Sequence, residues 1–240
     1  MMKRLFSLFI LTMFFTLFCF SAAQADPGKT HLVFIGGDAD YEECKNNIFR
    51  NMLIHNEMLQ SEAEAFFVKS ANKDYSNATA IQRTKEAEKF LSGEDRNVVA
   101  GYSHGGQSVF FLEAENISDI YLLDACVSIG GKCANPVSCG NVWSEWIIAT
   151  AGKGINVHCY ASIGKHDEPS GAKNAIRLIQ ERSVQDASLV DLGNGWYQVV
   201  DQDQNEAALI ELLLTEGTHK DICITTEERI TQYLFSGEEQ

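Results

Sequence analysis

A serine flanked by glycines is the most chemically suggestive feature of the chain. Residues 101–106 read Gly-Tyr-Ser-His-Gly-Gly, after an apolar run at residues 97–100 and before a helix-like run at residues 107–115. A strand that turns sharply into a helix needs small residues beside the tip, because side chains there would collide with the adjoining strand or helix. The turn lifts the hydroxyl of Ser103 clear of the backbone. The pattern therefore indicates a nucleophilic serine, which needs a neighbouring base because a serine hydroxyl is weakly nucleophilic at neutral pH.

Apolar runs predict the strands that would position this serine, and they cover residues 31–35, 63–69, 96–102, 120–129 and 155–163. Helical patterns are found at residues 43–60, 77–91, 103–115, 170–182, 207–214 and 225–235. A Gly-Asn-Gly turn at residues 193–195 predicts a hairpin over residues 188–200. Strands that alternate with helices are typical of a mostly parallel sheet with helices on both faces. The sequence therefore predicts one α/β domain over residues 26–240.

The Gly-x-Ser-x-Gly turn between a strand and a helix resembles the nucleophile elbow of the α/β-hydrolase superfamily, and that of bacterial lipases and esterases in particular. The resemblance covers nearly all of residues 26–240. It implies a Ser–His–Asp triad for acyl transfer, with Ser103 as nucleophile, His219 as base and Asp167 as acid. No cofactor is implied, since side chains and water suffice for this chemistry. The family's opening antiparallel strands are missing, so the chain resembles minimal versions such as cutinases and small thioesterases.

Several histidines compete for the role of base, at positions 31, 55, 104, 158, 166 and 219. His219 alone lies in a late loop, after the last strand and before the final helix, as the order of triad residues in this superfamily requires. His104 adjoins the nucleophile, but its side chain is expected to point away from the triad. His166 lies in the same loop as the candidate acid and is the rival of His219.

Two aspartates compete for the role of acid. Asp167 follows the fifth predicted strand, at the carboxyl edge of the sheet where α/β sites form. Asp124 lies inside the fourth predicted strand, where a buried carboxylate is costly unless it is paired, so it has a function of its own or supports the turn at Ser103. Glu168 is a weaker alternative. The sequence favours Asp167 but leaves Asp124 open as its replacement.

Acyl transfer also needs backbone N–H groups that stabilise the developing oxyanion. One donor is expected from His104, the residue after the nucleophile. The second is expected from the loop after the first strand, where Gly36 and Gly37 let the backbone approach a substrate closely. The pattern does not decide whether Gly37 or Asp38 supplies that N–H group.

The start of the chain predicts export. Lys3 and Arg4 precede an uncharged apolar run over residues 5–20 and an Ala-Gln-Ala site at residues 23–25, which predicts a signal peptide over residues 1–25 with cleavage after Ala25. The protein is then secreted or periplasmic, without a stable membrane span. Its formal net charge of −14 disfavours nucleic acids and anionic membrane surfaces as partners. The oligomeric state is not determined by these patterns.

Cysteines in an exported chain suggest disulfide bonds. Cys133 and Cys139 flank a short loop and are the expected pair, because closing a short loop costs little entropy. Cys126 and Cys159 lie in apolar runs, where buried free thiols compete with disulfides. Residues 132–154 interrupt the strand–helix alternation and carry Trp143, so this segment is either a lid over an acyl pocket or part of the core. Metal binding is disfavoured, since the cysteines and histidines do not cluster.

These features predict an exported serine hydrolase that cleaves a carboxylic ester or thioester through an acyl-enzyme on Ser103. Its substrate would be a small-molecule or lipid-like acyl compound. A peptidase or amidase with the same triad is an alternative within this class. A non-catalytic exported binding protein on the same fold is an alternative outside it, because function does not follow from fold.

Overall fold

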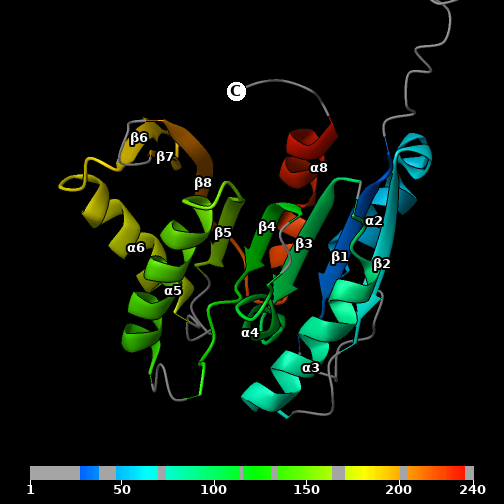
Figure 1. The fold of residues 1–240 in the computed structure, drawn as a ribbon, viewed down its shortest axis with the longest axis horizontal. Coiled ribbons are helices and arrows are strands. Elements are labelled where there is room, and N and C mark those ends of the chain that lie inside the picture. Colours follow the sequence, from blue (N-terminus) through cyan, green and yellow to red (C-terminus); the bar gives the residue numbers. More distant parts are fainter. Residues whose placement is uncertain are drawn as a thin grey trace, which may run out of the picture.

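The computed structural model describes residues 28–37, 47–69, 74–93, 95–113, 116–130, 135–163, 171–200 and 205–235. Eight strands form one mixed, mostly parallel sheet in the order β2-β1-β3-β4-β5-β8-β7-β6 (Figure 1). Only the β6–β7 hairpin and its pairing with β8 are antiparallel. The strands are β1 (Thr30–Ile35), β2 (Ala63–Val68), β3 (Asn97–Tyr102), β4 (Ile117–Leu123), β5 (Asn156–Ser162), β6 (Leu189–Gly193), β7 (Trp196–Val200) and β8 (Glu206–Thr215).

Helices cover both faces of the sheet, because alternate residues of the central strands are apolar on both sides. In β1, for example, Val33 packs in one core cluster and Phe34 in the other. The first cluster includes residues of α3 (Asn77–Ala87), α4 (Gly105–Val109), α5 (Pro136–Ala151) and α6 (Ala172–Ser183). The second includes residues of α2 (Ile48–His55), α7 (Ile222–Thr225) and α8 (Glu227–Phe235). Two 3₁₀ helices complete the described elements, η1 (Glu57–Ser61) and η2 (Glu88–Phe90).

The α/β class and the mostly parallel sheet predicted from the sequence are confirmed, but one predicted helix is wrong. Residues 207–214 were expected to be helical, whereas they form most of β8, which pairs with β5 on one side and β7 on the other. Alanine, leucine and glutamate favour helices in isolation, and tertiary packing overrides that preference here. Ile210 and Leu212 are buried in the first core cluster. The strand therefore joins the antiparallel hairpin to the parallel part of the sheet.

The fourth strand is displaced relative to its predicted bounds of 120–129. β4 begins at Ile117 and ends at Leu123, and the next residue, Asp124, has a left-handed backbone with φ of 46°. Residues 125–129 leave the sheet without regular secondary structure. The apolar run continues past the strand because Cys126 and Ile129 are buried in the core. The apolar run at residues 120–129 therefore indicates which residues are buried, but it does not indicate where β4 ends.

The segment that interrupts the alternation is mostly helical. α5 begins at Pro136 with a capping box, in which the side chain of Asn135 accepts a hydrogen bond from the Ser138 N–H. Trp143 and Ile147 are fully buried on the sheet, and the Trp143 indole donates a hydrogen bond to the Val127 carbonyl at 3.0 Å. Both side chains pack in the core, which was the alternative to a lid.

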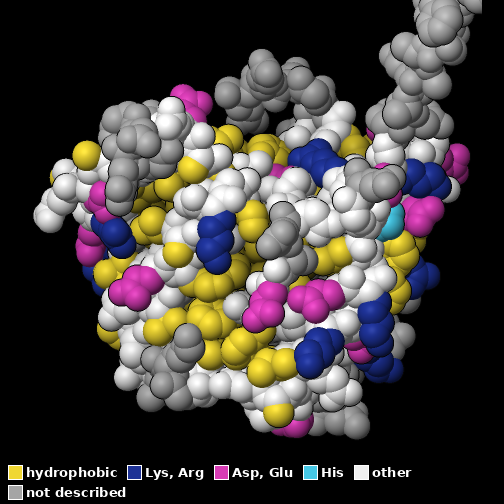
Figure 2. All heavy atoms as spheres, in the orientation of Figure 1, with side chains coloured by type: hydrophobic (Ala, Val, Ile, Leu, Met, Phe, Trp, Pro, Cys, Tyr) yellow, Lys and Arg dark blue, Asp and Glu magenta, His cyan; other side chains and the backbone are white. Residues whose placement is uncertain are grey.

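Short α4 leaves the face of the sheet between α3 and α5 incompletely covered, and Figure 2 shows hydrophobic side chains at the surface there. Partly buried side chains that pack against the first core cluster include Phe110, Phe111, Leu112 and Trp146. A cavity of about 400 Å³ lies between the starts of β4 and β5 and the end of α5, and Ile117, Trp146 and Ile155 contribute to its lining. This cavity is at the amino edge of the sheet, whereas Ser103 is at the carboxyl edge.

Two further predictions rest on residues outside the described ranges. The signal peptide over residues 1–25 is one of them. The Cys133–Cys139 disulfide is the other, since Cys133 is not described, although Cys139 is buried and is not among the free cysteines. Within the described ranges, no helix has both the length and the apolar character needed to cross a membrane.

Candidate functional site

Ser103 lies at the tip of a tight turn at the carboxyl edge of the sheet. It follows β3, its N–H donates a hydrogen bond to the Leu123 carbonyl of β4 at 3.1 Å, and its own carbonyl accepts one from Gly106 at 3.0 Å. Its backbone is left-handed, with φ of 51°. Such a conformation costs a non-glycine residue about 1–3 kcal/mol and persists only where the surrounding structure enforces it. The residue is only 8% exposed, so the serine is held in a strained and sheltered position.

The glycines of the motif are required by close packing. A Cβ atom on Gly101 would lie 2.6 Å from the Val109 side chain and 2.9 Å from the backbone of Gly106. A Cβ atom on Gly105 would lie 2.0 Å from the Ile35 carbonyl oxygen of β1. Neither gap accommodates a side chain, so α4 can begin immediately beside β1 and β3 only with glycine at these positions. This is the steric reason for small residues that the sequence pattern indicated.

His219 lies beside this turn. It follows β8 in a turn where the Asp221 carboxylate accepts hydrogen bonds from the Thr218 N–H at 2.9 Å and the Thr218 hydroxyl at 2.8 Å. The imidazole stacks on the ring of Tyr102, with the centroids 5.0 Å apart, and the Tyr102 hydroxyl donates a hydrogen bond to the His219 carbonyl at 3.1 Å. Tyr102 immediately precedes Ser103. The structure therefore places the predicted base against the residue that precedes the predicted nucleophile, although the two are far apart in sequence.

Asp124 contacts His219. Asp124 follows β4, the neighbour of β3, and its Oδ2 lies 3.3 Å from Nδ1 of His219. Its other carboxylate oxygen accepts a hydrogen bond from the Ser162 N–H at 3.0 Å, and its own N–H donates to the Tyr160 carbonyl at 2.9 Å. Asp124 is buried, and these two hydrogen bonds attach its backbone and its carboxylate to the end of β5. Asp167, Glu168 and the rival base His166 lie outside the described residues.

Two of the predicted oxyanion donors, Gly37 and His104, lie close to Ser103. Gly37 follows β1 and is buried, and a Cβ atom on it would lie 2.9 Å from the Cβ of Ser103. Only a glycine allows the backbone this close to the serine. His104 is the next residue after Ser103, and its ring stacks on Tyr75 with the centroids 3.8 Å apart. Asp38, the alternative donor, is outside the described residues.

The remaining described histidines are engaged elsewhere. His31 Nδ1 contacts the Phe90 carbonyl at 2.8 Å near the amino end of β1, and His55 Nδ1 contacts the Glu227 carboxylate at 2.6 Å. His158 is completely buried in β5. No group of three or more metal-binding side chains occurs among the residues that the structure describes. A serine with a histidine and a carboxylate nearby is suited to nucleophilic and acid–base chemistry.

A second polar cluster surrounds His158 on the face of the sheet that α8 covers. Nδ1 of His158 lies 2.7 Å from the Glu211 carboxylate of β8, and Nε2 lies 3.5 Å from the Asp119 carboxylate of β4. Arg229 of α8 pairs with Glu211, and Arg96 pairs with Asp119 at 2.7 Å. Sequence reasoning missed this cluster because Glu211 was assigned to a helix. The signal that could have revealed the cluster is the presence of a charged residue in each of two apolar strands, Asp119 in β4 and Glu211 in β8.

The charged groups of this cluster shift one another's pKa values. Burial by itself lowers the pKa of His158, but the hydrogen bonds and charges of Asp119 and Glu211 outweigh it, so the pKa is raised. Burial by itself raises the pKa values of both carboxyl groups, but the hydrogen bonds and charge of His158, with the arginines, hold them below their ordinary values. The charged forms of all three groups are therefore favoured in the folded protein.

This cluster predicts a fall in stability at alkaline pH. The protonated form of His158 stabilises the fold fully below about pH 6.5, the ordinary pKa of histidine, and that contribution is lost as pH rises through the higher folded value. Asp119 and Glu211 act in the opposite sense and lose their contribution as pH falls below about 4. We expect the free energy of unfolding in urea to decrease from about pH 6 to about pH 9 in the wild type.

His158→Gln tests this prediction. The variant should be destabilised by about 3–5 kcal/mol near pH 6, because it removes the positive charge between two buried carboxylates, and its stability should depend less on alkaline pH. His55→Gln is the matched control, since it removes a mostly exposed pair with Glu227. Equal alkaline slopes for wild type and His158→Gln would contradict the assignment.

Comparison with known proteins does not assign this chain to a family. No family model matches the chain, and no curated protein is significantly similar to it.

Proposed function

We propose that this chain is a serine hydrolase of the α/β-hydrolase superfamily that cleaves a carboxylic ester or thioester through an acyl-enzyme on Ser103. The observation that carries the proposal is the left-handed turn at Ser103, with His219 stacked on the preceding residue and paired with Asp124. These groups come from three separate segments that follow β3, β8 and β4 at one edge of the sheet. The order of strands around β3 supports the superfamily, because the nucleophile follows a central strand.

The first half of the reaction acylates the serine. The Asp124 carboxylate faces Nδ1 of His219 and thereby favours the tautomer with the proton on Nδ1, in which Nε2 is unprotonated and can accept a proton. The Ser103 oxygen attacks the carbonyl carbon while Nε2 takes the hydroxyl proton. The N–H groups of His104 and Gly37 stabilise the oxyanion of the tetrahedral intermediate. This intermediate collapses when the alcohol or thiol leaves with the proton held by His219.

The second half regenerates the enzyme. His219 removes a proton from water as the water oxygen attacks the acyl carbon, and the bond to the Ser103 oxygen then breaks as that oxygen recovers its proton. The products are the carboxylic acid and the free enzyme. We propose Asp124 as the acid that orients His219, because it is the described carboxylate in contact with the imidazole. This replaces the sequence-based preference for Asp167.

Covalent labelling with a fluorophosphonate separates an enzyme from a binding protein on this fold. An activated serine oxygen attacks the phosphorus and expels fluoride, whereas an ordinary serine does not react. We expect a single adduct on Ser103 at neutral pH, identified by mass spectrometry of the labelled peptide.

Ser144→Ala is the matched control for this experiment. Ser144 is as buried as Ser103, at 9% exposed, but it lies in α5 and donates its hydroxyl to the Asn141 carbonyl. This variant should label like the wild type, and Ser103→Ala should not label. Absence of any adduct on a folded wild-type protein would favour the binding protein. Labelling without ester turnover, but with amide turnover, would favour the peptidase or amidase.

A further inference from the structure

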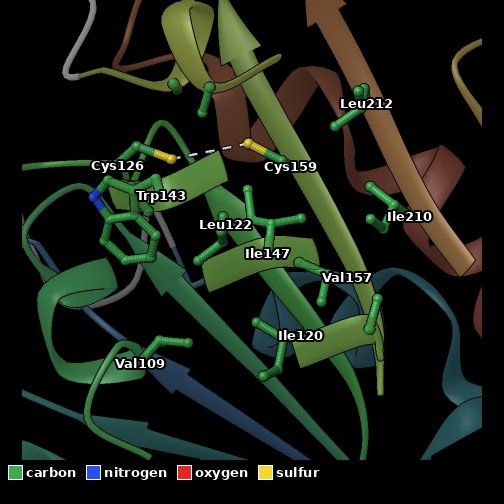
Figure 3. Packing of buried hydrophobic residues seen from close by; sticks show 14 of the residues in the cluster. Val109, Ile120, Leu122, Cys126, Trp143, Ile147, Val157, Cys159, Ile210 and Leu212 are labelled. Carbon is green, nitrogen blue, oxygen red and sulfur yellow. Dashed lines mark hydrogen bonds between the residues drawn. The ribbon is translucent and has the colours of Figure 1, made fainter. Parts of the chain in front are cut away.

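Two free thiols meet inside the first core cluster. The Sγ atoms of Cys126 and Cys159 lie 3.9 Å apart, and Figure 3 shows them pointing toward one another above Trp143 and Ile147. Both cysteines are completely buried. Cys126 lies in the irregular segment that follows Asp124, and Cys159 lies in β5. Nothing in the proposed reaction uses either thiol.

We propose that Cys126 and Cys159 form a disulfide bond when the chain folds in the presence of a disulfide oxidant such as oxidised glutathione. One thiolate attacks a sulfur of oxidised glutathione and forms a mixed disulfide, and one glutathione thiolate leaves. The second cysteine thiolate then attacks the protein-bound sulfur and displaces the other glutathione. The two cysteines lose two electrons and two protons, and one oxidised glutathione is reduced to two glutathione molecules.

The bond needs only a small movement of the two sulfur atoms. A disulfide requires a sulfur–sulfur distance of about 2.05 Å, so the two atoms must approach by roughly 2 Å. Cys159 is fixed in the interior of the sheet, where β5 pairs with β4 and β8. Cys126 is not in a helix or strand, so its backbone takes no part in the pairing of the strands. The bond therefore requires less disruption of the sheet if Cys126 moves than if Cys159 moves.

Burial determines when the bond can form. Thiol–disulfide exchange requires a thiolate, and burial, assisted by the neighbouring Cys159, raises the pKa of the Cys126 thiol. The folded protein also shields both sulfur atoms from an oxidant. Exchange therefore takes place on the folding chain, before α5 closes over the pair, and the completed bond is then protected from external reductants.

The bond would connect the segment after Asp124 to β5. It closes a loop from Cys126 to Cys159 that contains the whole of α5. Cross-linking a loop of this kind stabilises a protein mainly by restricting its unfolded state. Cys223 offers a matched comparison, because it is also a buried free cysteine but packs in the second core cluster with α7.

Alkylation without reduction tests the pairing directly. The full-length protein is refolded in a mixture of reduced and oxidised glutathione, unfolded in urea with iodoacetamide, digested and analysed by mass spectrometry. We expect Cys223 to be alkylated, whereas Cys126 and Cys159 are recovered unmodified as one cross-linked peptide pair. Alkylation of Cys126 and Cys159 to the same extent as Cys223, or recovery of either one bonded to another cysteine, would overturn the proposal.

Thermal unfolding supplies a second measurement that does not depend on enzymatic activity. Protein refolded with dithiothreitol should melt at least about 4 °C below protein refolded with the glutathione mixture. In Cys126→Ala, dithiothreitol should lower the melting temperature by less than in the wild type, since the proposed disulfide cannot form. In Cys223→Ala, it should lower the melting temperature as much as in the wild type. An identical response of Cys126→Ala and wild type would show that the pair contributes no disulfide.

Discussion

Ser103→Ala is expected to reduce the hydrolysis of p-nitrophenyl acetate by about 10⁶-fold in kcat, because loss of the nucleophile removes the acyl-enzyme route altogether. A small residual rate above the buffer reaction should persist, since the backbone N–H groups near Ser103 still stabilise an oxyanion. Release of p-nitrophenolate measures the effect, and circular dichroism verifies that the variant is folded.

The same assay on Ser144→Ala controls for the loss of a buried hydroxyl. This variant should retain wild-type turnover. Undiminished turnover by folded Ser103→Ala would rule out Ser103 as the nucleophile. A wild-type protein that binds acyl compounds without hydrolysing any ester, thioester or amide would instead indicate a binding protein.

The second large effect is expected for Asp124→Asn, which should reduce kcat by about 10⁴-fold with a much smaller change in KM. An asparagine amide that donates to Nδ1 of His219 stabilises the wrong tautomer, with the proton on Nε2, and the imidazole can then no longer accept the serine proton. The Ser162 N–H can still donate to the asparagine side-chain oxygen, so the segment keeps one of its attachments.

Asp167→Asn is the matched comparison for this prediction. If Asp124 orients the base, the Asp167 variant should retain most of the wild-type activity. A loss confined to Asp167→Asn would reverse the assignment and restore the preference drawn from the sequence. Fluorophosphonate labelling of both variants provides an independent readout, because it follows activation of Ser103 without requiring turnover of a substrate.

Sequence patterns were most informative where short-range sterics decide the structure. The turn at residues 101–106 needs glycine because Gly101 and Gly105 contact backbone or side-chain atoms of neighbouring elements. This steric requirement can be read from the sequence, because it restricts positions 101 and 105 to glycine. The central strands β1, β3 and β5 were also predicted within a residue of their observed bounds, since strands buried on both faces are continuous apolar runs.

Patterns were less informative where distant parts of the chain decide the structure. Residues 206–215 have helical preferences, but pairing with β5 on one side and with β7 on the other stabilises them as a strand. The pairing of His219 with Asp124 depends on how β4 and β8 are placed in the sheet, which local patterns do not encode. An aspartate inside an apolar run was nevertheless a visible sign that this carboxylate is engaged.

Ser103 and Asp124 both have left-handed backbones, with φ of 51° and 46°, which links the proposed chemistry to a trade-off between stability and activity. Glycine would adopt both conformations without steric cost, so Ser103→Gly should raise the melting temperature while abolishing turnover. A binding protein on this fold would be more stable with glycine at both positions. If the proposed reaction is correct, the strained backbone at these two neighbouring strand ends is a cost in stability that the chain retains for catalysis.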